Sequence, residues 1–274
     1  MEYAYLFVRK VKSRLPKILH ELYTINRPTI HLLRIKKEKE MGSDNKIVIN
    51  SRIKLAIKIT IRILMFLIFS GLLLFLPADT LKFWQVWVYY ITILIPLLFT
   101  VLYYLKNDPE FLKQRSGRKE KEKEQKPLQI LFVFIFLIGF LIPGFDFRFH
   151  WSNIPIFIVI LFDLFVLLGY LIIIVTMKEN RFASAIIETT KDQKVIETGP
   201  YKIVRHPMYS GGMIFMLFTP IALGSYWALI PSLVGISTWL VLRIINEEKY
   251  LINNLSGYKK YCQKTKYRLI PFIW

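Results

Sequence analysis

The chain is poor in cysteine and in acidic residues: it has one cysteine, Cys262, and 19 Asp and Glu against 38 Lys and Arg in 274 residues. A single cysteine excludes an intrachain disulfide and argues against a cysteine-based metal cluster. The glycine-rich G-x-G-x-x-G loop is also absent, which argues against a soluble nucleotide-binding domain. No spacing of His, Cys, Asp or Glu is typical of a metal site, so we expect no metal.

The first 50 residues lack the apolar core of a cleavable signal peptide. They include a basic, weakly amphipathic stretch, Tyr5–Tyr23, that we expect to lie on the anionic inner leaflet. An alternative is that Met41, which precedes "GSDNK", is the true start of the protein.

Long hydrophobic runs are what the sequence has in excess. Hydrophobic residues make up 54% of the chain, above the 45–50% of typical soluble domains. The apolar regions that are long enough to consider as membrane spans are Ile59–Leu76, Trp84–Leu105, Leu128–Pro143, Ile154–Met177 and Pro207–Ile245. The last is too long for one span and contains the turn signal Gly224-Ser225, so we expect it to form two antiparallel helices. The sequence therefore predicts an all-α integral membrane bundle of about six spans.

Lys and Arg alternate between the two sides of this bundle. The segments 1–52, 106–127 and 178–206 and the tail from Arg243 hold twelve, eight, six and seven of them, whereas 78–83 and 144–153 hold one each. This pattern follows the positive-inside rule for six spans with both termini in the cytoplasm. Most of the net charge of +19 is thus explained by the orientation of the spans in the membrane. We therefore expect a lipid bilayer and no nucleic acid as a partner.

The predicted hairpin brings two polar clusters to one membrane face. A helix of seventeen residues rises about 25 Å, and the next helix returns by a similar length. The residues that meet are Arg205, His206 and Tyr209 at the start of the fifth span and Arg243, Glu247 and Glu248 near the end of the sixth.

These two clusters suit a ligand that carries both an amine and a carboxylate. Arg205 and a helix N-terminus form an anion-binding corner, and it faces a pair of carboxylates. S-adenosylmethionine is such a ligand, and we expect it as the cofactor. Alternatively, the basic and tyrosine side chains are routine membrane anchors, and the glutamates pair with Arg243 or Lys249.

The motifs of this region carry a resemblance to a known family. "TGPYKIVRHPMYSGG", "RIINEE" and "GYKKYCQ", with "YRLIPFIW" at the end, resemble the C-terminal half of isoprenylcysteine carboxyl methyltransferases, over roughly Glu179–Trp274. Membrane phospholipid N-methyltransferases are similar. "LPADTLKFWQVW" and "NDPEFLKQRSG" resemble upstream parts of bacterial members.

The resemblance implies roles for individual residues. Glu247 is expected to bind the methyl donor, and Arg243 to face the substrate. The remaining residues that are expected to bind the donor are Gln193, Lys194, Val195, Ile196, Tyr201, Arg205, His206, Pro207, Met208 and Tyr209. The stretch "ENRFASAIIETTKDQ" departs from eukaryotic members, so the acceptor pocket is left open.

The expected reaction is methyl transfer to a lipophilic acceptor, most simply a carboxylate as in isoprenylcysteine O-methylation, with Arg243 orienting it. An amine acceptor, as in phospholipid N-methylation, requires a general base, for which Glu248 or Tyr209 is the candidate. A thiol acceptor is a further alternative. The apolar runs, the charge pattern and the resemblance together divide the chain into a basic cytoplasmic arm (1–53), four transmembrane helices (54–177) and a methyltransferase core with its site at the cytoplasmic face (178–274).

Two other functional classes stay open. Membrane sterol reductases, which use NADPH, share a tail similar to "YCQKTKYRLIPFIW" and an Arg-His-Pro motif. A non-enzymatic scaffold or small transporter is the other class, although transporters have polar breaks at mid-membrane depth.

Asp163 lies in the middle of the fourth span, and we do not assign it to the site.

Overall fold

The computed structural model describes residues 49–117, 126–182 and 193–274. Most of the predicted N-terminal arm (1–53), including Met41, lies outside the described residues, as does most of the charged stretch Ser116–Lys126. The chain divides into two compact units, 1–57 and 58–274, and all contacts discussed below lie within the second.

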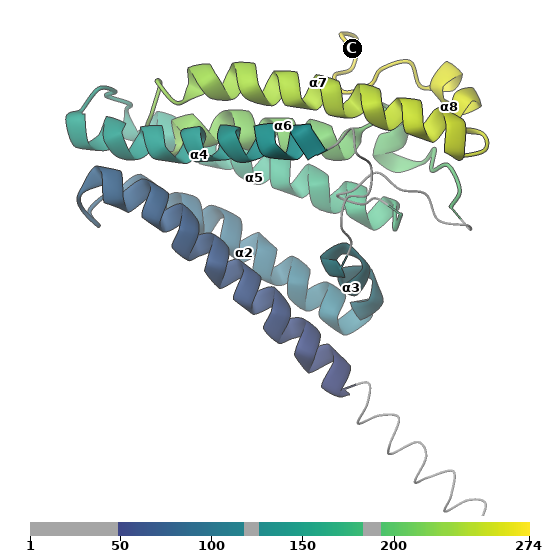
Figure 1. Cartoon of the computed structure of the whole chain (residues 1–274), viewed down its shortest axis with the longest axis horizontal. Coiled ribbons are helices and arrows are strands. Elements are labelled where there is room, and N and C mark those ends of the chain that lie inside the picture. Colours follow the sequence, from purple (N-terminus) through teal and green to yellow (C-terminus); the bar gives the residue numbers. More distant parts are fainter. Residues whose placement is uncertain (1–48, 118–125, 183–192) are drawn as a thin grey trace, which may run out of the picture. The chain divides into compact units, whose positions relative to one another are not determined.

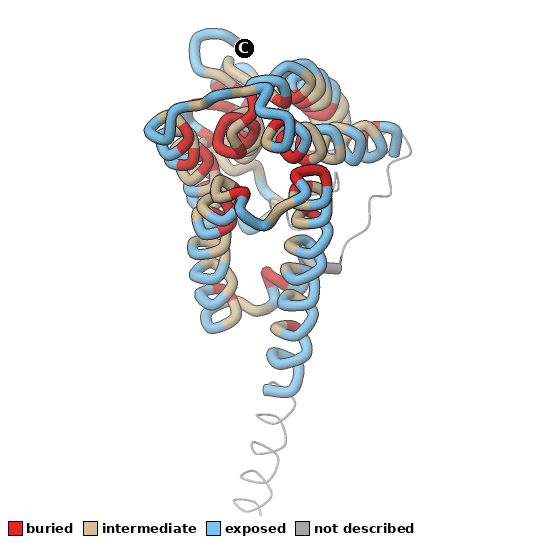
Figure 2. Tube along the Cα trace, turned by 90° about the vertical axis from the view of Figure 1, so that its left-hand side faces the viewer, coloured by how far each residue is buried: buried red, intermediate tan, exposed pale blue. Residues whose placement is uncertain are grey.

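The described residues form helices and no strand, which confirms the all-α prediction (Figure 1). Within the described ranges, five helices are long and apolar enough to cross a membrane: the first helix Ile49–Ala78, α2 (Trp84–Asn107), α4 (Lys126–Phe149), α5 (Ile156–Glu179) and α7 (Leu229–Asn254). The shorter helices are α3 (Pro109–Gly117), the 3-10 turn η2 (Gly199–Lys202), α6 (Pro207–Ala222) and α8 (Tyr258–Lys264). Exposed residues run along the outer sides of the long helices, where lipid is expected to cover their apolar side chains (Figure 2).

Some predicted spans differ from the structure: the first helix begins at Ile49, ten residues before the expected start at Ile59. The third span was expected to end at Pro143, but α4 continues through this proline to Phe149. A proline inside a helix removes one backbone hydrogen bond, and neighbouring helices make this tolerable in a membrane segment. The predicted fifth span corresponds to α6, whose 16 residues rise about 24 Å, less than the roughly 30 Å hydrocarbon core.

The predicted helical hairpin is present as α6 and α7. Gly224 turns the chain with a φ of 79°, a conformation that favours glycine. The turn is fixed by Asp146 of α4, a buried carboxylate that accepts hydrogen bonds from the Ser225 hydroxyl and from Ser152 N and Oγ, both at 2.7 Å. The hairpin is therefore tied to α4 at the end opposite the polar clusters.

Helices α5 and α6 pack backbone to backbone at a pair of glycines. A Cβ atom added to Gly211 lies 2.7 Å from the carbonyl oxygen of Gly169, and one added to Gly169 lies 2.6 Å from the amide of Phe215. Side chains cannot be accommodated at such distances, so the crossing requires glycine on both helices. It sets the position of the first turn of α6, which carries Tyr209 and directly follows His206.

We predict that Gly211→Ala destabilises the protein by at least about 1–3 kcal/mol, because the helices must separate. Gly212→Ala is the matched control: nothing lies within 4 Å of its added Cβ, and alanine favours a helix by up to about 1 kcal/mol. Thermal unfolding of the two purified variants checks this. Equal stability of the two variants contradicts the glycine crossing.

Candidate active site

The segment before α6 is held in place by a glycine and two tyrosines. Gly199 has a φ of 55°, and a Cβ there would lie 2.9 Å from the Glu179 side chain. Tyr201 follows, and its carbonyl oxygen accepts a hydrogen bond from Tyr261 Oη at 2.8 Å. Its hydroxyl accepts one from Asn180 Nδ2 at 3.0 Å. The Gly-Pro-Tyr motif therefore links the end of α5, η2 and α8.

The C-terminal tail, residues 265–274, holds the next two residues by their backbone. Arg205 N donates to Tyr267 O and His206 N donates to Arg268 O, both at 2.9 Å. Ser210 Oγ, one turn into α6, donates to Leu269 O at 2.6 Å. The tail therefore runs beside the start of α6 and orients both side chains of the Arg-His pair.

Glu248 is a buried carboxylate shared by three basic side chains. Its Oε1 lies 3.1 Å from Arg205 Nε and 3.3 Å from His206 Nε2, and its Oε2 accepts a hydrogen bond from Arg268 Nε at 2.8 Å. Only 6% of the Glu248 side chain is exposed. Because burial penalises an isolated charge, these partners keep the carboxylate and the guanidinium groups in place together.

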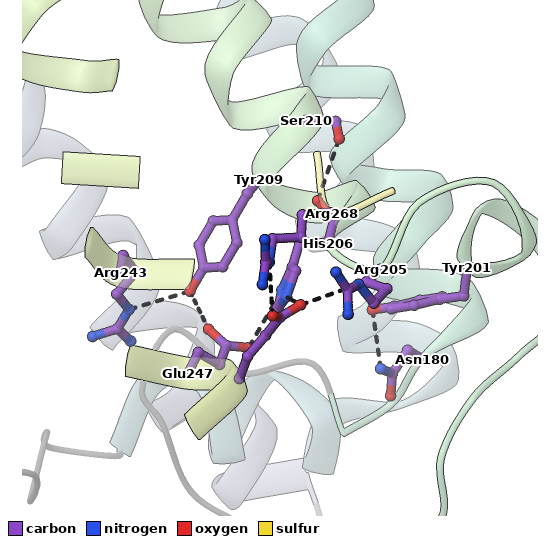
Figure 3. A network of polar contacts seen from close by, with 10 residues as sticks. Asn180, Tyr201, Arg205, His206, Tyr209, Ser210, Arg243, Glu247 and Arg268 are labelled. Atoms are coloured by element: carbon purple, nitrogen blue, oxygen red, sulfur yellow. Dashed lines mark hydrogen bonds and ion pairs between the residues drawn. The ribbon is translucent and has the colours of Figure 1, made fainter. Parts of the chain in front are cut away.

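Glu247, the neighbouring residue, takes part in a second chain of contacts. Tyr209 Oη donates to Glu247 Oε2 at 2.5 Å and accepts from Arg243 Nε at 3.2 Å. Figure 3 shows the tyrosine hydroxyl between the guanidinium and the carboxylate. His206 Nδ1 lies 3.9 Å from Glu247 Oε1, so the two chains of contacts meet at His206.

A pocket of about 90 Å³ opens beside these residues. Ten of the eleven residues predicted to bind a cofactor line it. They are Gln193, Lys194, Val195, Ile196, Tyr201, Arg205, His206, Met208, Tyr209 and Glu247. Pro207 begins α6 without lining the pocket, and the predicted catalytic residues Arg243 and Glu248 lie behind Tyr209 and His206.

Two details of the predicted site need correction. Arg205 and the glutamates were expected to face each other across a ligand, but Arg205 contacts Glu248 directly. Glu248 was a candidate general base, but it does not line the pocket and its oxygens already contact three basic groups. Such a carboxylate is a poor proton acceptor, so its geometry favours a positioning role.

Several pocket residues were missed by the sequence analysis. They are Asn180, Phe182, Leu251, Leu255, Tyr258 and Tyr261. Leu251 and Leu255 follow Glu247 at intervals of four, so helical periodicity could have identified them. The tyrosines of α8 have no such signal, because the chain reverses at Gly257 (φ 85°) before α8 begins.

Burial keeps the pocket tyrosines protonated. It raises the pKa of the Tyr201 hydroxyl to about 12, more than the hydrogen bond from Asn180 lowers it. Burial, together with the charge of Glu248, also raises the pKa of Tyr258. Both hydroxyls are therefore hydrogen-bond donors near neutral pH rather than bases.

Asp163 does not belong to this pocket. It is buried in α5, and both of its carboxylate oxygens lack a hydrogen-bond partner among the described residues. None of the pocket-lining residues neighbours it in sequence.

Comparison with known families identifies the region that builds the site. Residues 157–257 match the model of the phospholipid methyltransferase family, PEMT. The match covers 101 of the 274 residues, so the chain is similar to this family over somewhat more than a third of its length. The matched region includes α5, η2, α6 and α7, and it ends before α8 and the tail. No curated protein matches the chain.

We predict that Glu248→Ala lowers the free energy of unfolding by about 3–5 kcal/mol, because it leaves Arg205 and His206 buried without a carboxylate. Glu247→Ala is the neighbouring control. Its side chain is 23% exposed, and loss of its hydrogen bond with Tyr209 costs about 1.5–3 kcal/mol. Thermal unfolding in detergent separates the two. A Glu248→Ala variant as stable as Glu247→Ala would show that the buried cluster contributes little.

Proposed function

We propose that the protein is an S-adenosylmethionine-dependent methyltransferase that methylates a lipophilic acceptor within the membrane. The observation that carries this proposal is the composition of the pocket inside the region that matches the phospholipid methyltransferases. Glu247 is the one carboxylate among the described pocket-lining residues, and the lining also holds the hydrogen-bond donors Arg205 and Tyr258.

The described groups fit a zwitterionic methyl donor. The Glu247 carboxylate suits an ammonium group. Tyr258 lines the pocket with a buried hydroxyl that has no hydrogen-bond partner among the described residues, and Arg205, whose Nε is paired with Glu248, lines it as well. These donors suit a carboxylate or a ribose hydroxyl, and the N-terminus of α6 favours negative charge nearby.

The pocket volume of about 90 Å³ is below the roughly 300–1,000 Å³ of small-molecule sites. Binding therefore requires pocket side chains to move apart. Lys194 is exposed and Gln193 is half-buried, so both can be displaced. We expect Gln193–Ile196 to close over the bound donor.

The bound donor supplies a methyl group on a sulfonium, which is reactive enough to need alignment rather than activation. Arg243, held beside Tyr209 Oη, is placed to orient an acceptor carboxylate with its guanidinium. The buried tyrosines and the apolar residues Leu251 and Leu255 exclude water from the reacting groups. The protein contributes mainly proximity and orientation.

A second cavity supports a lipophilic acceptor. It has a volume of about 340 Å³ and lies between the first helix, α2, α4, α6 and α7, with walls that include Phe136, Gly139 and Met216. Met216 is seven residues from Tyr209 on α6, about 10 Å along the helix axis. A lipid chain in this cavity would leave its polar end near Tyr209 and Arg243.

We expect a carboxylate acceptor, as in isoprenylcysteine O-methylation, because Arg243 adjoins the pocket and Glu248 is occupied. The matching family's name, phospholipid methyltransferase, favours a phospholipid amine as the second candidate. The same match weighs against the NADPH-dependent reductase. We further propose that the site faces the cytoplasm, with both termini on that side.

Calorimetric titration of the detergent-purified protein with S-adenosylmethionine and, separately, with NADPH tests this proposal. We expect the methyl donor to bind, NADPH not to bind, and Glu247→Ala to weaken the donor about 10- to 100-fold, the loss of a charged hydrogen bond. Glu197→Ala is the matched control, since Glu197 pairs with Lys264 and does not line the pocket. Binding of NADPH alone would favour a reductase, and binding of neither would favour a scaffold.

A further inference from the structure

The C-terminal tail ends in an ordered turn. Ile273 N donates to Ile270 O at 3.2 Å, which closes a β-turn with Pro271 and Phe272 at its centre. Trp274 O then accepts hydrogen bonds from the amides of Arg268 and Leu269, both at 2.8 Å, and of Ile270 at 3.1 Å. The tip of the tail is therefore held in one conformation by its own backbone.

Phe272 occupies a turn position that ordinarily belongs to glycine. Its φ is 66°, in the left-handed region, and it follows Pro271. A proline followed by a residue with positive φ is the pattern of a type II turn, in which glycine or asparagine is preferred at the third position. An aromatic side chain there adds backbone strain, so it calls for a reason other than the turn itself.

The two tip side chains are largely exposed, and the Phe272 ring has an aromatic neighbour in Tyr267, with ring centres 5.3 Å apart. Phe272 is 87% exposed and Ile273 is 76% exposed, the highest fractions among the described large hydrophobic residues. Their neighbours face inward: Leu269, Ile270 and Trp274 pack against the cluster of Ile236, Leu240 and Ile244 on α7. The tail runs back from α8 along α7 (Figure 1). The tip thus lies beside a membrane-spanning helix, with its apolar side chains pointing outward.

Basic side chains stand directly before the tip. Lys266 is exposed, and the Arg268 guanidinium lies 5.3 Å from the centre of the Trp274 ring. Aromatic and aliphatic side chains next to lysine and arginine are the composition of segments that bind at the interface of an anionic bilayer. If the tip were surrounded by water alone, the strained backbone of Phe272 and the exposure of two apolar side chains would both be unfavourable.

We propose that Phe272 and Ile273 form a tip that inserts into the bilayer interface, with Lys266 meeting anionic lipid headgroups. The tip anchors the tail whose carbonyl groups at Tyr267 and Arg268 hold the amides of Arg205 and His206. The bilayer thereby helps to order the candidate active site. This inference does not depend on which reaction the site performs.

Site-directed spin labelling tests the insertion, and the single cysteine makes it practicable. A nitroxide is attached at Phe272→Cys in a Cys262→Ser background, in nanodiscs that contain phosphatidylglycerol. We expect the label to be accessible to oxygen, which partitions into lipid, and protected from a water-soluble nickel chelate. A label at Lys266→Cys is the control and should be open to the chelate.

Equal chelate accessibility at the two positions would overturn the proposal. In nanodiscs that hold two copies of the protein, the label could be protected from the chelate and also show spin–spin broadening. That result would overturn the proposal in favour of a protein–protein contact. Neither result depends on methyl-donor binding, so the failure of this inference is distinct from the failure of the proposed function.

The link to the site is tested by hydrogen exchange in the same nanodiscs. Phe272→Gly combined with Ile273→Ser removes the tip side chains and relieves the positive φ, so a purely structural turn would be retained or improved. We expect several-fold faster exchange at the amides of Arg205 and His206 in this variant, and unchanged exchange in Phe272→Leu. Unchanged exchange in the double variant would show that the tip does not order the site.

Discussion

The arrangement of the candidate site depends on one buried carboxylate, that of Glu248. It joins three parts of the chain that are distant in sequence, because Arg205 and His206 directly precede α6, Glu248 lies on α7 and Arg268 lies on the tail. Removing charged groups from water is costly, and the cost is recovered only when opposite charges and hydrogen bonds are well placed. The ion-pair cluster can therefore form only when α6, α7 and the tail are all in register.

The consecutive residues Glu247 and Glu248 have different roles where α6, α7 and the tail meet. Successive residues on a helix point about 100° apart, so Glu248 faces the basic cluster while Glu247 reaches the pocket through its contact with Tyr209. The first carboxylate fixes the positions of Arg205 and His206, and the second stays available to a cationic ligand. The side of the pocket formed by the ion-pair cluster is therefore fixed, and the side that includes Glu247 can adapt to a ligand. Such adaptation is required because the pocket is smaller than a typical ligand site.

The sequence was a good guide where helix geometry decides the outcome. A turn at Gly224 and equal rises on either side predict that the two polar clusters meet at one level, and the contact between Tyr209 and Glu247 is one instance. The resemblance to membrane methyltransferases, together with the anion-binding corner at Arg205, led to ten of the sixteen pocket-lining residues. Apolar length also predicted the long helices, because it is summed over many residues.

Individual side-chain contacts and the positions of irregular segments could not be predicted from the sequence. The direct pairing of Arg205 with Glu248 depends on side-chain rotamers and on where the tail lies. Tyr258 reaches the pocket only because the chain reverses at Gly257, and no periodicity crosses such a turn. Pro143 predicted a helix end because the effect of a proline on the backbone is local. The helix α4 continues through it because of packing against other helices, which the local sequence does not contain.

The central claim is methyl transfer to a membrane lipid, and the most direct measurement follows the methyl group itself. The protein in nanodiscs is incubated with tritiated S-adenosylmethionine and a native lipid extract, and the lipid fraction is then treated with alkali. The account predicts label in the lipid fraction that alkali releases as volatile methanol, as from a methyl ester, and that Arg243→Ala abolishes. Alkali-stable label would replace the carboxylate by an amine or a thiol, and the absence of label together with oxidation of added NADPH would contradict the account.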